Sequence, residues 1–157
     1  MTEKEMWDRY CTENGMEPNT PYDAWAFCGG GPSADELAAL VLAGRKTATA
    51  SALIAYETEG VPLPQSGCYS VVLYADGTAA GIIRDTRVSL VPFNEVSAEH
   101  AYLEGEGTRT LEEWREVHKR VFTPDYQTVG KEFDEKGICV LEEFELVYPV
   151  QKAISVH

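Results

Sequence analysis

The chain has 157 residues, of which 26 are Asp or Glu and 13 are Lys or Arg, so its formal net charge is −13. This length suits one domain with a real hydrophobic core, and the acidic charge disfavours long contacts with nucleic acid or anionic membranes. The four cysteines form no Cys-x-x-Cys pair, and we find neither an apolar run of bilayer length nor a signal peptide, so we expect reduced thiols and a cytoplasmic protein.

The N-terminal part of the chain favours one helix followed by a loop. Apolar residues at helical spacing predict a helix over residues 2–14 that ends at Gly15. Residues 16–32 are rich in Pro and Gly, which is typical of a loop. Within this loop Trp25 and Phe27 lie on one side of an extended segment, where they either pack in the core or stack against a planar base.

A second helix and a small strand flank an isolated basic pair, Arg45-Lys46. The helix is predicted to begin with the capping box Ser33-Ala34-Asp35-Glu36 and to stop at Gly44, and the strand covers residues 47–51. Lys46 and Thr49 bracket small residues that would allow a ligand close to the backbone. Side chains three apart in a strand point to opposite faces, so these two converge only if the chain bends after Gly44. The alternative is a surface lysine at a helix C-terminus and a threonine chosen for strand propensity.

The rest of the chain alternates strands and helices. Periodicity, capping and turn signals predict a short helix at 52–59, strands at 68–74 and 79–90 joined across Asp76-Gly77, helices at 97–104 and 110–121, a polar loop over 124–137 and a last strand at 138–148. Strands separated by helices at irregular spacing, with a hairpin in the middle, predict an α+β fold with a curved sheet or small barrel.

Two familiar kinds of site are disfavoured by spacing. His100, His118 and His157 do not show the spacing of metal ligands on one element, so we expect no metal and interpret His118 as a packed histidine. The glycine run before the second helix is not followed by Gly-Lys-Ser/Thr, which argues against a phosphate-binding loop.

The segment Glu104-Gly105-Glu106-Gly107 places two carboxylates on flexible backbone after a helix. Alone, this pattern is typical of a solvated loop. Paired with Lys46, a carboxylate would hold the amine in place. Partial burial would then favour a neutral lysine able to take a proton from a hydroxyl or water.

Taken together, these motifs resemble the ASCH domain family. The residues that carry the resemblance are Trp25-Ala26-Phe27, Ala34-Asp35-Glu36-Leu37, Leu42-Ala43-Gly44-Arg45-Lys46-Thr47-Ala48-Thr49-Ala50-Ser51, Pro62-Leu63-Pro64, Pro92-Phe93-Asn94-Glu95-Val96, Glu104-Gly105-Glu106-Gly107 and Leu111-Glu112-Glu113-Trp114-Arg115-Glu116-Val117-His118. Membership implies a PUA-like fold, a small β-barrel with flanking helices, and a role with RNA or nucleotides. We therefore expect an N-terminal helical extension (1–21), an ASCH domain (22–148) and a C-terminal tail (149–157).

The resemblance also implies site residues. In the small bacterial members that hydrolyse N4-acetylcytidine, a lysine, a threonine and a glutamate carry catalysis, and these positions match Lys46, Thr49 and Glu104, with Glu106 as a rival. The chain departs from those hydrolases in its N-terminal extension and its longer loop at 52–66. It also carries Cys68 where many relatives have an aspartate.

The resulting hypothesis is amide hydrolysis in which neutral Lys46 takes a proton from Thr49 or water, while Glu104 positions the lysine or protonates the leaving amine. The residues expected to bind substrate are Trp25, Phe27, Arg45, Arg84 and Glu106. The alternatives are a non-catalytic RNA- or nucleotide-binding module and a metal-independent ribonuclease. We expect no cofactor, no membrane partner, and a nucleoside or short single-stranded RNA as the ligand.

Overall fold

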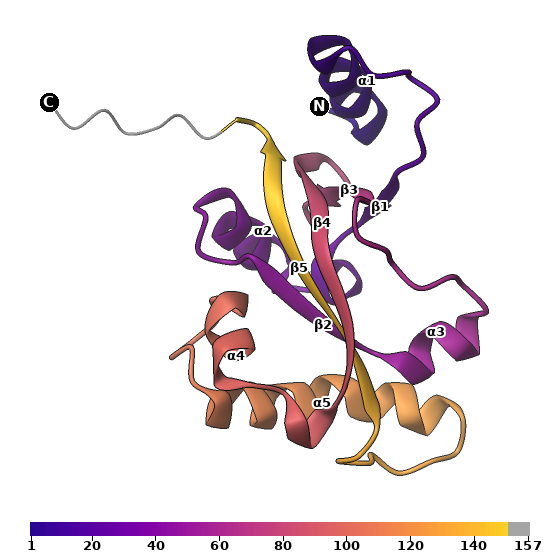
Figure 1. The fold of residues 1–157 in the computed structure, drawn as a ribbon, viewed down its shortest axis with the longest axis vertical. Coiled ribbons are helices and arrows are strands. Elements are labelled where there is room, and N and C mark those ends of the chain that lie inside the picture. The colour runs from indigo at the N-terminus through magenta and orange to yellow at the C-terminus, as the bar shows by residue number, and fades with distance from the viewer. Residues whose placement is uncertain (151–157) are drawn as a thin grey trace, which may run out of the picture.

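Five strands pair in the order β1-β3-β4-β5-β2 and form one curled sheet, half of a barrel (Figure 1). The computed structural model describes residues 1–150. The strands are β1 (Asp23–Trp25), β2 (Ala48–Ala52), β3 (Tyr69–Leu73), β4 (Ala79–Pro92) and β5 (Ile138–Tyr148). β1 runs parallel to β3, and all other neighbours are antiparallel. The α+β architecture predicted from the sequence is therefore confirmed.

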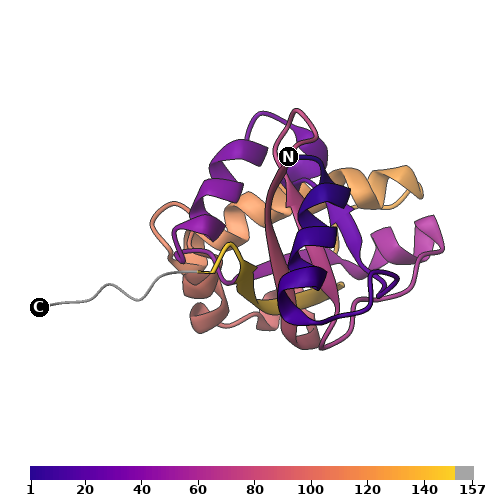
Figure 2. The same cartoon turned by 90° about the horizontal axis from the view of Figure 1, so that it is seen from above.

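Helices lie around both ends of this sheet. They are α1 (Glu3–Asn14), α2 (Ala34–Leu42), α3 (Leu53–Glu59), α4 (Ala98–Glu104) and α5 (Leu111–Thr128), with short 3-10 turns η1 (Phe27–Gly30) and η2 (Phe93–Glu95). Figure 1 shows α1 near the upper end of the sheet, and α4 and α5 at its lower end. The view from above places α1 in front of the strands (Figure 2). The two ends are thus covered by different helices.

Most predicted elements are confirmed. The first helix ends at Gly15, whose φ of 64° is the left-handed conformation that glycine adopts without strain. The hairpin across Asp76-Gly77 joins β3 to β4. The helix that precedes the acidic loop begins at Ser97, whose hydroxyl accepts a hydrogen bond from the backbone N–H of His100.

The capping box predicted at Ser33 is wrong. Ser33 has helical backbone angles (φ −83°, ψ −8°) and its side chain makes no capping bond, whereas an N-cap needs an extended backbone to aim its oxygen at the next turn. Asp35 accepts a hydrogen bond from the N–H of Ala75 instead, which ties the start of α2 to the β3–β4 turn.

The long helix after Thr110 extends further than predicted, to Thr128, so the first residues of the expected 124–137 loop are helical. Proline inside a helix removes a hydrogen bond and costs about 3 kcal/mol. Phe122 and Tyr126 are buried on either side of Pro124, and burying two aromatic side chains offsets a cost of this size.

The expected loop at residues 16–32 contains the short strand β1, which pairs with β3 through Asp23, Ala24 and Trp25. Three residues at a sheet edge give too short a pattern to stand out from a loop.

The core consists of three clusters that follow the sheet from end to end. One lies under α1 around Trp7, one under α2 around Phe27 and Phe144, and one between the sheet and α5 around Phe93 and Trp114. Lys46 lies near Phe27 of the second cluster, and Glu104 is bonded to Trp114 of the third; both are among the largest fully buried side chains.

Candidate functional site

The bend after Gly44 turns the side chain of Lys46 into the molecule. Gly44 has a φ of 77°, and the backbone N–H groups of Arg45 and Lys46 both donate to the carbonyl oxygen of Leu40, over 3.0 and 3.1 Å. Lys46 is consequently 1% exposed. Its ammonium nitrogen lies 5.3 Å from the ring centroid of Phe27.

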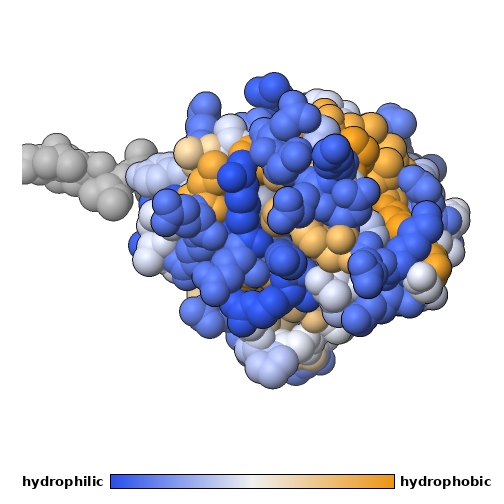
Figure 3. All heavy atoms as spheres, turned by 90° about the horizontal axis from the view of Figure 1, so that it is seen from below, coloured by the Kyte–Doolittle hydropathy of each residue, from blue (hydrophilic) through white to orange (hydrophobic). Residues whose placement is uncertain are grey.

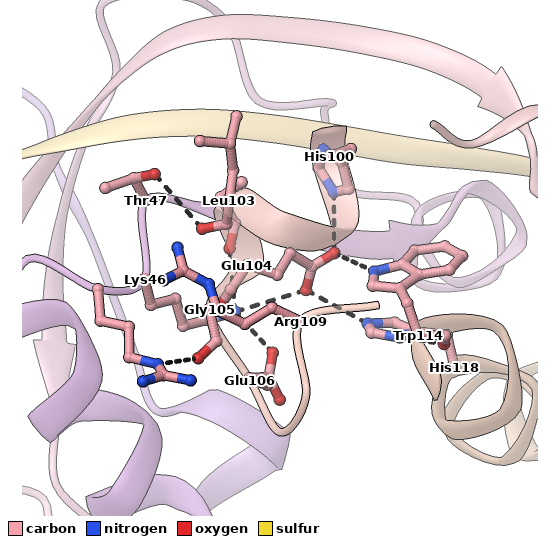
Figure 4. A network of polar contacts seen from close by, with 12 residues as sticks. Lys46, Thr47, His100, Leu103, Glu104, Gly105, Glu106, Arg109, Trp114 and His118 are labelled. Atoms are coloured by element: carbon pink, nitrogen blue, oxygen red, sulfur yellow. Dashed lines mark hydrogen bonds and ion pairs between the residues drawn. The ribbon is translucent and has the colours of Figure 1, made fainter. Parts of the chain in front are cut away.

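The contacts of Lys46 favour its charged form. Its Nζ donates to the carbonyl oxygen of Ala48 at 2.9 Å, to Glu106 Oε2 at 2.8 Å and to Glu104 Oε1 at 3.4 Å (Figure 4). An ammonium group has three N–H donors, and here each one has an acceptor. Two of the acceptors are carboxylates, which stabilise the positive charge. These surroundings argue against the neutral resting lysine that the sequence-based mechanism assumed.

Glu104 is the centre of a buried hydrogen-bond network. Its Oε2 accepts from Trp114 Nε1 at 2.6 Å and lies 2.8 Å from His100 Nε2, while its Oε1 lies 3.3 Å from His118 Nε2 (Figure 4). Burial acts to raise the pKa of this carboxyl group. The hydrogen bonds from the two histidines and the charge of Lys46 outweigh it, and they hold the pKa well below its usual range. Glu104 is therefore an ionised carboxylate.

Arg45 holds the loop that carries both glutamates. Its Nε donates to the carbonyl oxygen of Gly105 at 2.7 Å, and its Nη2 donates to that of Gly107 at 3.2 Å. Gly105 has a φ of 72°, and a Cβ atom there would lie 2.3 Å from the carbonyl oxygen of Arg45. The predicted substrate-binding residue Arg45 thus holds the backbone of the loop. The close approach of its carbonyl oxygen explains why residue 105 must be glycine.

A cavity of about 200 Å³ opens beside this network, between α2 and the α4–α5 segment. Glu104, Glu106, His118 and Trp114 line it on one side, and Leu37 and Leu40 of α2 line it on the other. Glu36 and Glu113 add two further carboxylates. The face of the molecule seen from below is mostly hydrophilic, with apolar side chains in small separate patches (Figure 3).

Four other predicted site residues lie apart from this cavity lining. Thr49 is on β2 opposite Glu142, and within residues 1–150 no hydrogen bond joins it to Lys46. Phe27 is buried in the core and Trp25 packs edge-on against it, with 4.9 Å between the ring centroids. Arg84 lies 3.4 Å from Glu145 on the surface.

Sequence reasoning missed the two histidines and the tryptophan that bind Glu104. Their spacing offered a signal, because His100 precedes Glu104 by four residues on α4 and Trp114 precedes His118 by four on α5. Residues four apart share a helix face.

A second buried acidic pair was also missed. Asp85 on β4 and Glu142 on β5 are 4% and 9% exposed. Burial, a hydrogen bond with Asp85 and the nearby charges of Asp85 and Asp23 raise the pKa of Glu142 to about 9. Burial also raises the pKa of Asp85.

Residues 1–150 contain neither a cluster of metal ligands nor a membrane-spanning helix. No group of three or more His, Cys, Asp or Glu side chains in this part of the chain is arranged to hold a metal ion. None of its helices combines the length and the apolar character needed to cross a bilayer.

The fold and the site together define an α+β, PUA-like protein with a buried lysine between two glutamates. Residues 23–148 match the ASCH domain family. The chain is 35% identical to an ASCH domain from Lactobacillus crispatus JV V101, whose crystal structure aligns with a TM-score of 0.86 over 94% of this chain and 96% of that one. Protein EF3133 from Enterococcus faecalis V583 is 33% identical, with a TM-score of 0.83 over 92% of this chain and 86% of that one. No curated protein matches. The chain belongs to the ASCH domain family.

Proposed function

We propose that this protein hydrolyses the amide bond of a small acylated nucleoside of the N4-acetylcytidine type. The observation that carries the proposal is the placement of Lys46 between Glu104 and Glu106, two carboxylates that line the wall of a small cavity. Buried charged groups next to a cavity are expensive to maintain for stability alone and are typical of reaction centres.

The cavity favours a small ligand without a phosphate. Its volume of about 200 Å³ is close to the size of a single base with an acyl group and below the usual range for drug-sized ligands. Four glutamates in its lining and a net charge of −13 repel anions. A neutral nucleoside therefore fits better than a nucleotide or a long RNA.

The three charged side chains suggest separate roles. Glu106 has a side chain that is 32% exposed, so its carboxylate is available to take a proton from an attacking water. The three N–H donors of Lys46 are already paired, so Lys46 would act through its positive charge, which stabilises the negative charge that develops on the carbonyl oxygen of the amide. Glu104 would position the ammonium group. Thr49 directly follows Ala48, whose carbonyl oxygen accepts from Lys46, and we retain it as a residue to test.

The test is turnover of N4-acetylcytidine, followed through release of cytidine and acetate. Lys46→Gln, Glu104→Gln, Glu106→Gln and Thr49→Ala variants are compared with Glu145→Gln, which changes only an exposed ion pair. We expect losses in kcat of about 100-fold or more for Lys46→Gln and Glu106→Gln and none for Glu145→Gln. Unchanged turnover in all four site variants would overturn the proposal.

The other two functions suggested by the family resemblance are outcomes of the same set of measurements. Saturable, salt-sensitive RNA binding without any product would favour a binding module. Cleavage of a labelled oligonucleotide in the presence of a chelator would favour a ribonuclease.

A further inference from the structure

Both ring nitrogens of His118 face hydrogen-bond acceptors. Its Nδ1 lies 2.8 Å from the backbone carbonyl oxygen of Trp114. A carbonyl oxygen can only accept, so Nδ1 carries a hydrogen. In a neutral ring the other nitrogen, Nε2, would then have a lone pair, yet it lies 3.3 Å from Glu104 Oε1. A carboxylate oxygen at this distance attracts a proton on Nε2, so the geometry favours a ring with hydrogens on both nitrogens.

The network around Glu104 places that proton on the histidine. Glu104 Oε1 also faces the ammonium group of Lys46 at 3.4 Å, and Oε2 accepts from Trp114. The hydrogen bonds from His100 and His118, and after them the charge of Lys46, outweigh burial and keep the pKa of Glu104 well below its usual range. The carboxyl group therefore has little affinity for the proton, and His118 donates through both nitrogens.

Packing fixes the ring in this orientation at the cavity wall. The imidazole stacks on the indole of Trp114, with 4.1 Å between centroids and 16° between planes, and the ring of Phe122 meets it edge-on. His118 and Glu104 both line the cavity of about 200 Å³. A ring locked in this way can exchange its Nε2 proton but cannot turn away.

His100 offers an internal comparison. It also contacts Glu104, through Nε2 at 2.8 Å, but it lines a second cavity, of about 180 Å³, which Arg87, Ser89 and Glu143 share. Only one of the two histidines that bind Glu104 therefore borders the cavity where we place the substrate.

We propose that His118 is the acid of the reaction, the group that protonates the leaving amine. This inference rests on the proposed amide hydrolysis. Water attacks the carbonyl carbon and gives one proton to Glu106. The C–N bond then breaks as the Nε2 proton of His118 moves to the departing nitrogen. The products are the amine and the carboxylic acid, and transfer of the proton from Glu106 back to His118 restores the starting state.

The first test is NMR of the protein labelled with ¹⁵N-histidine, and it is independent of turnover. We expect His118 to show two protonated ring nitrogens at pH 7 in the unaltered protein, with the His118→Gln variant used to assign its signals. A single protonated nitrogen would overturn the inference whatever the activity.

The second test compares a poor leaving group with a good one. His118→Gln keeps an N–H group but cannot release a proton, so its loss in kcat on N4-acetylcytidine should exceed its loss on 4-nitrophenyl acetate by about 30-fold or more, because nitrophenolate leaves without an acid. His100→Gln, which disturbs Glu104 from the far side, should lower both rates by similar factors.

The outcomes separate the two proposals. Equal losses on both substrates in His118→Gln would show a structural role and remove this inference alone. Failure of the unaltered protein to hydrolyse any N-acyl nucleoside would remove the proposed function, and the role of His118 with it.

Discussion

At the cavity, the carboxylate of Glu104 meets four nitrogen donors, whereas on the sheet the carboxyl group of Glu142 meets another acid. Both side chains are buried. The first has a pKa well below its usual range, and the second has one raised to about 9. The difference teaches that burial alone does not decide whether an acid is charged, because the neighbouring groups do.

The contrast also separates the wall of the cavity from the interior of the sheet. The ionised Glu104 lies against Lys46 and the cavity, which is where a reaction can use charge. The raised pKa values of Asp85 and Glu142 favour one proton held between these two acids, and Glu142 lies opposite Thr49 of β2 in the sheet. Such a pair weakens the fold at high pH, when the proton is lost.

The largest effect should come from Glu104→Gln. This change leaves the Lys46 ammonium group buried with one fewer carboxylate, and breaking a buried pair costs about 3–5 kcal/mol. Urea denaturation at pH 7 measures the free energy of unfolding. Glu145→Gln, at a surface pair, is the control. A loss of less than about 1 kcal/mol would mean that Glu104 is not tied to its donors as described.

The next effect concerns the loop that holds both glutamates. Gly105→Ala would place a Cβ atom 2.3 Å from the carbonyl oxygen of Arg45, whereas Gly130 has a similar φ of 73° with nothing within 4 Å of its Cβ position. Both variants bear the cost of a left-handed alanine, about 1–2 kcal/mol. We expect Gly105→Ala to unfold at least about 1 kcal/mol more easily than Gly130→Ala, as the clash adds to that cost. Equal losses would contradict the close packing of the loop.

The acidic pair predicts a pH dependence of the opposite sign to that of Glu104. Below pH 4.5, Glu142 is protonated in both the folded and unfolded chains. Between there and about pH 9 the unfolded chain releases the proton while the folded chain keeps it, so stability falls as the pH rises.

Glu142→Gln should therefore flatten this alkaline decline and stabilise the protein by about 1–3 kcal/mol at pH 9, because no buried charge forms. Thermal unfolding from pH 5 to pH 9 measures the effect, with Glu143→Gln as the neighbouring control. An unchanged slope would show that the pair does not hold a proton.

The stability that Glu104 contributes to the fold depends on pH in the acidic range. Its lowered pKa stabilises the folded chain above the ordinary glutamate range, and this stability is lost as the pH falls below about 4.5. When thermal unfolding is followed further down, below about pH 4.5, the loss of stability should therefore be shallower in Glu104→Gln than in the unaltered protein.

The smallest effect is expected on the surface. Arg84 pairs with Glu145 at 3.4 Å, with exposed side chains of 41% and 54%. Arg84→Ala should change the free energy of unfolding by less than about 1 kcal/mol, since solvent screens such pairs. A larger change, or a large change in turnover, would give Arg84 a role that its position does not suggest.

Strong local signals predicted much of the fold. Gly15, the Asp76-Gly77 turn and the Ser97 cap set element ends through backbone geometry that few residues satisfy. The failures came where distant contacts decide. Asp35 bonds to the β3–β4 turn and leaves no capping bond at Ser33, and buried aromatics carry α5 past Pro124.

The site was predictable only in part for the same reason. The family resemblance pointed to Lys46 and to the acidic loop, and the structure brings them together. Three of the four donors to Glu104 come from α4 and α5, and no local pattern states which face of α5 meets the carboxylate. The charge state of Lys46 depends on that assembly as well, which is why a neutral amine was assumed.

The position of β2 at the edge of the sheet has a consequence for synthesis of the chain. Its partner there is β5, the last strand, and Lys46 reaches its carboxylates across 58 and 60 residues. A chain still emerging from the ribosome can form the β3–β4 hairpin. The Lys46 side chain, however, stays exposed to water until β5 is released and β2 can pair with it. The buried cluster of Lys46, Glu104 and Glu106 should thus be the last part of the molecule to become organised.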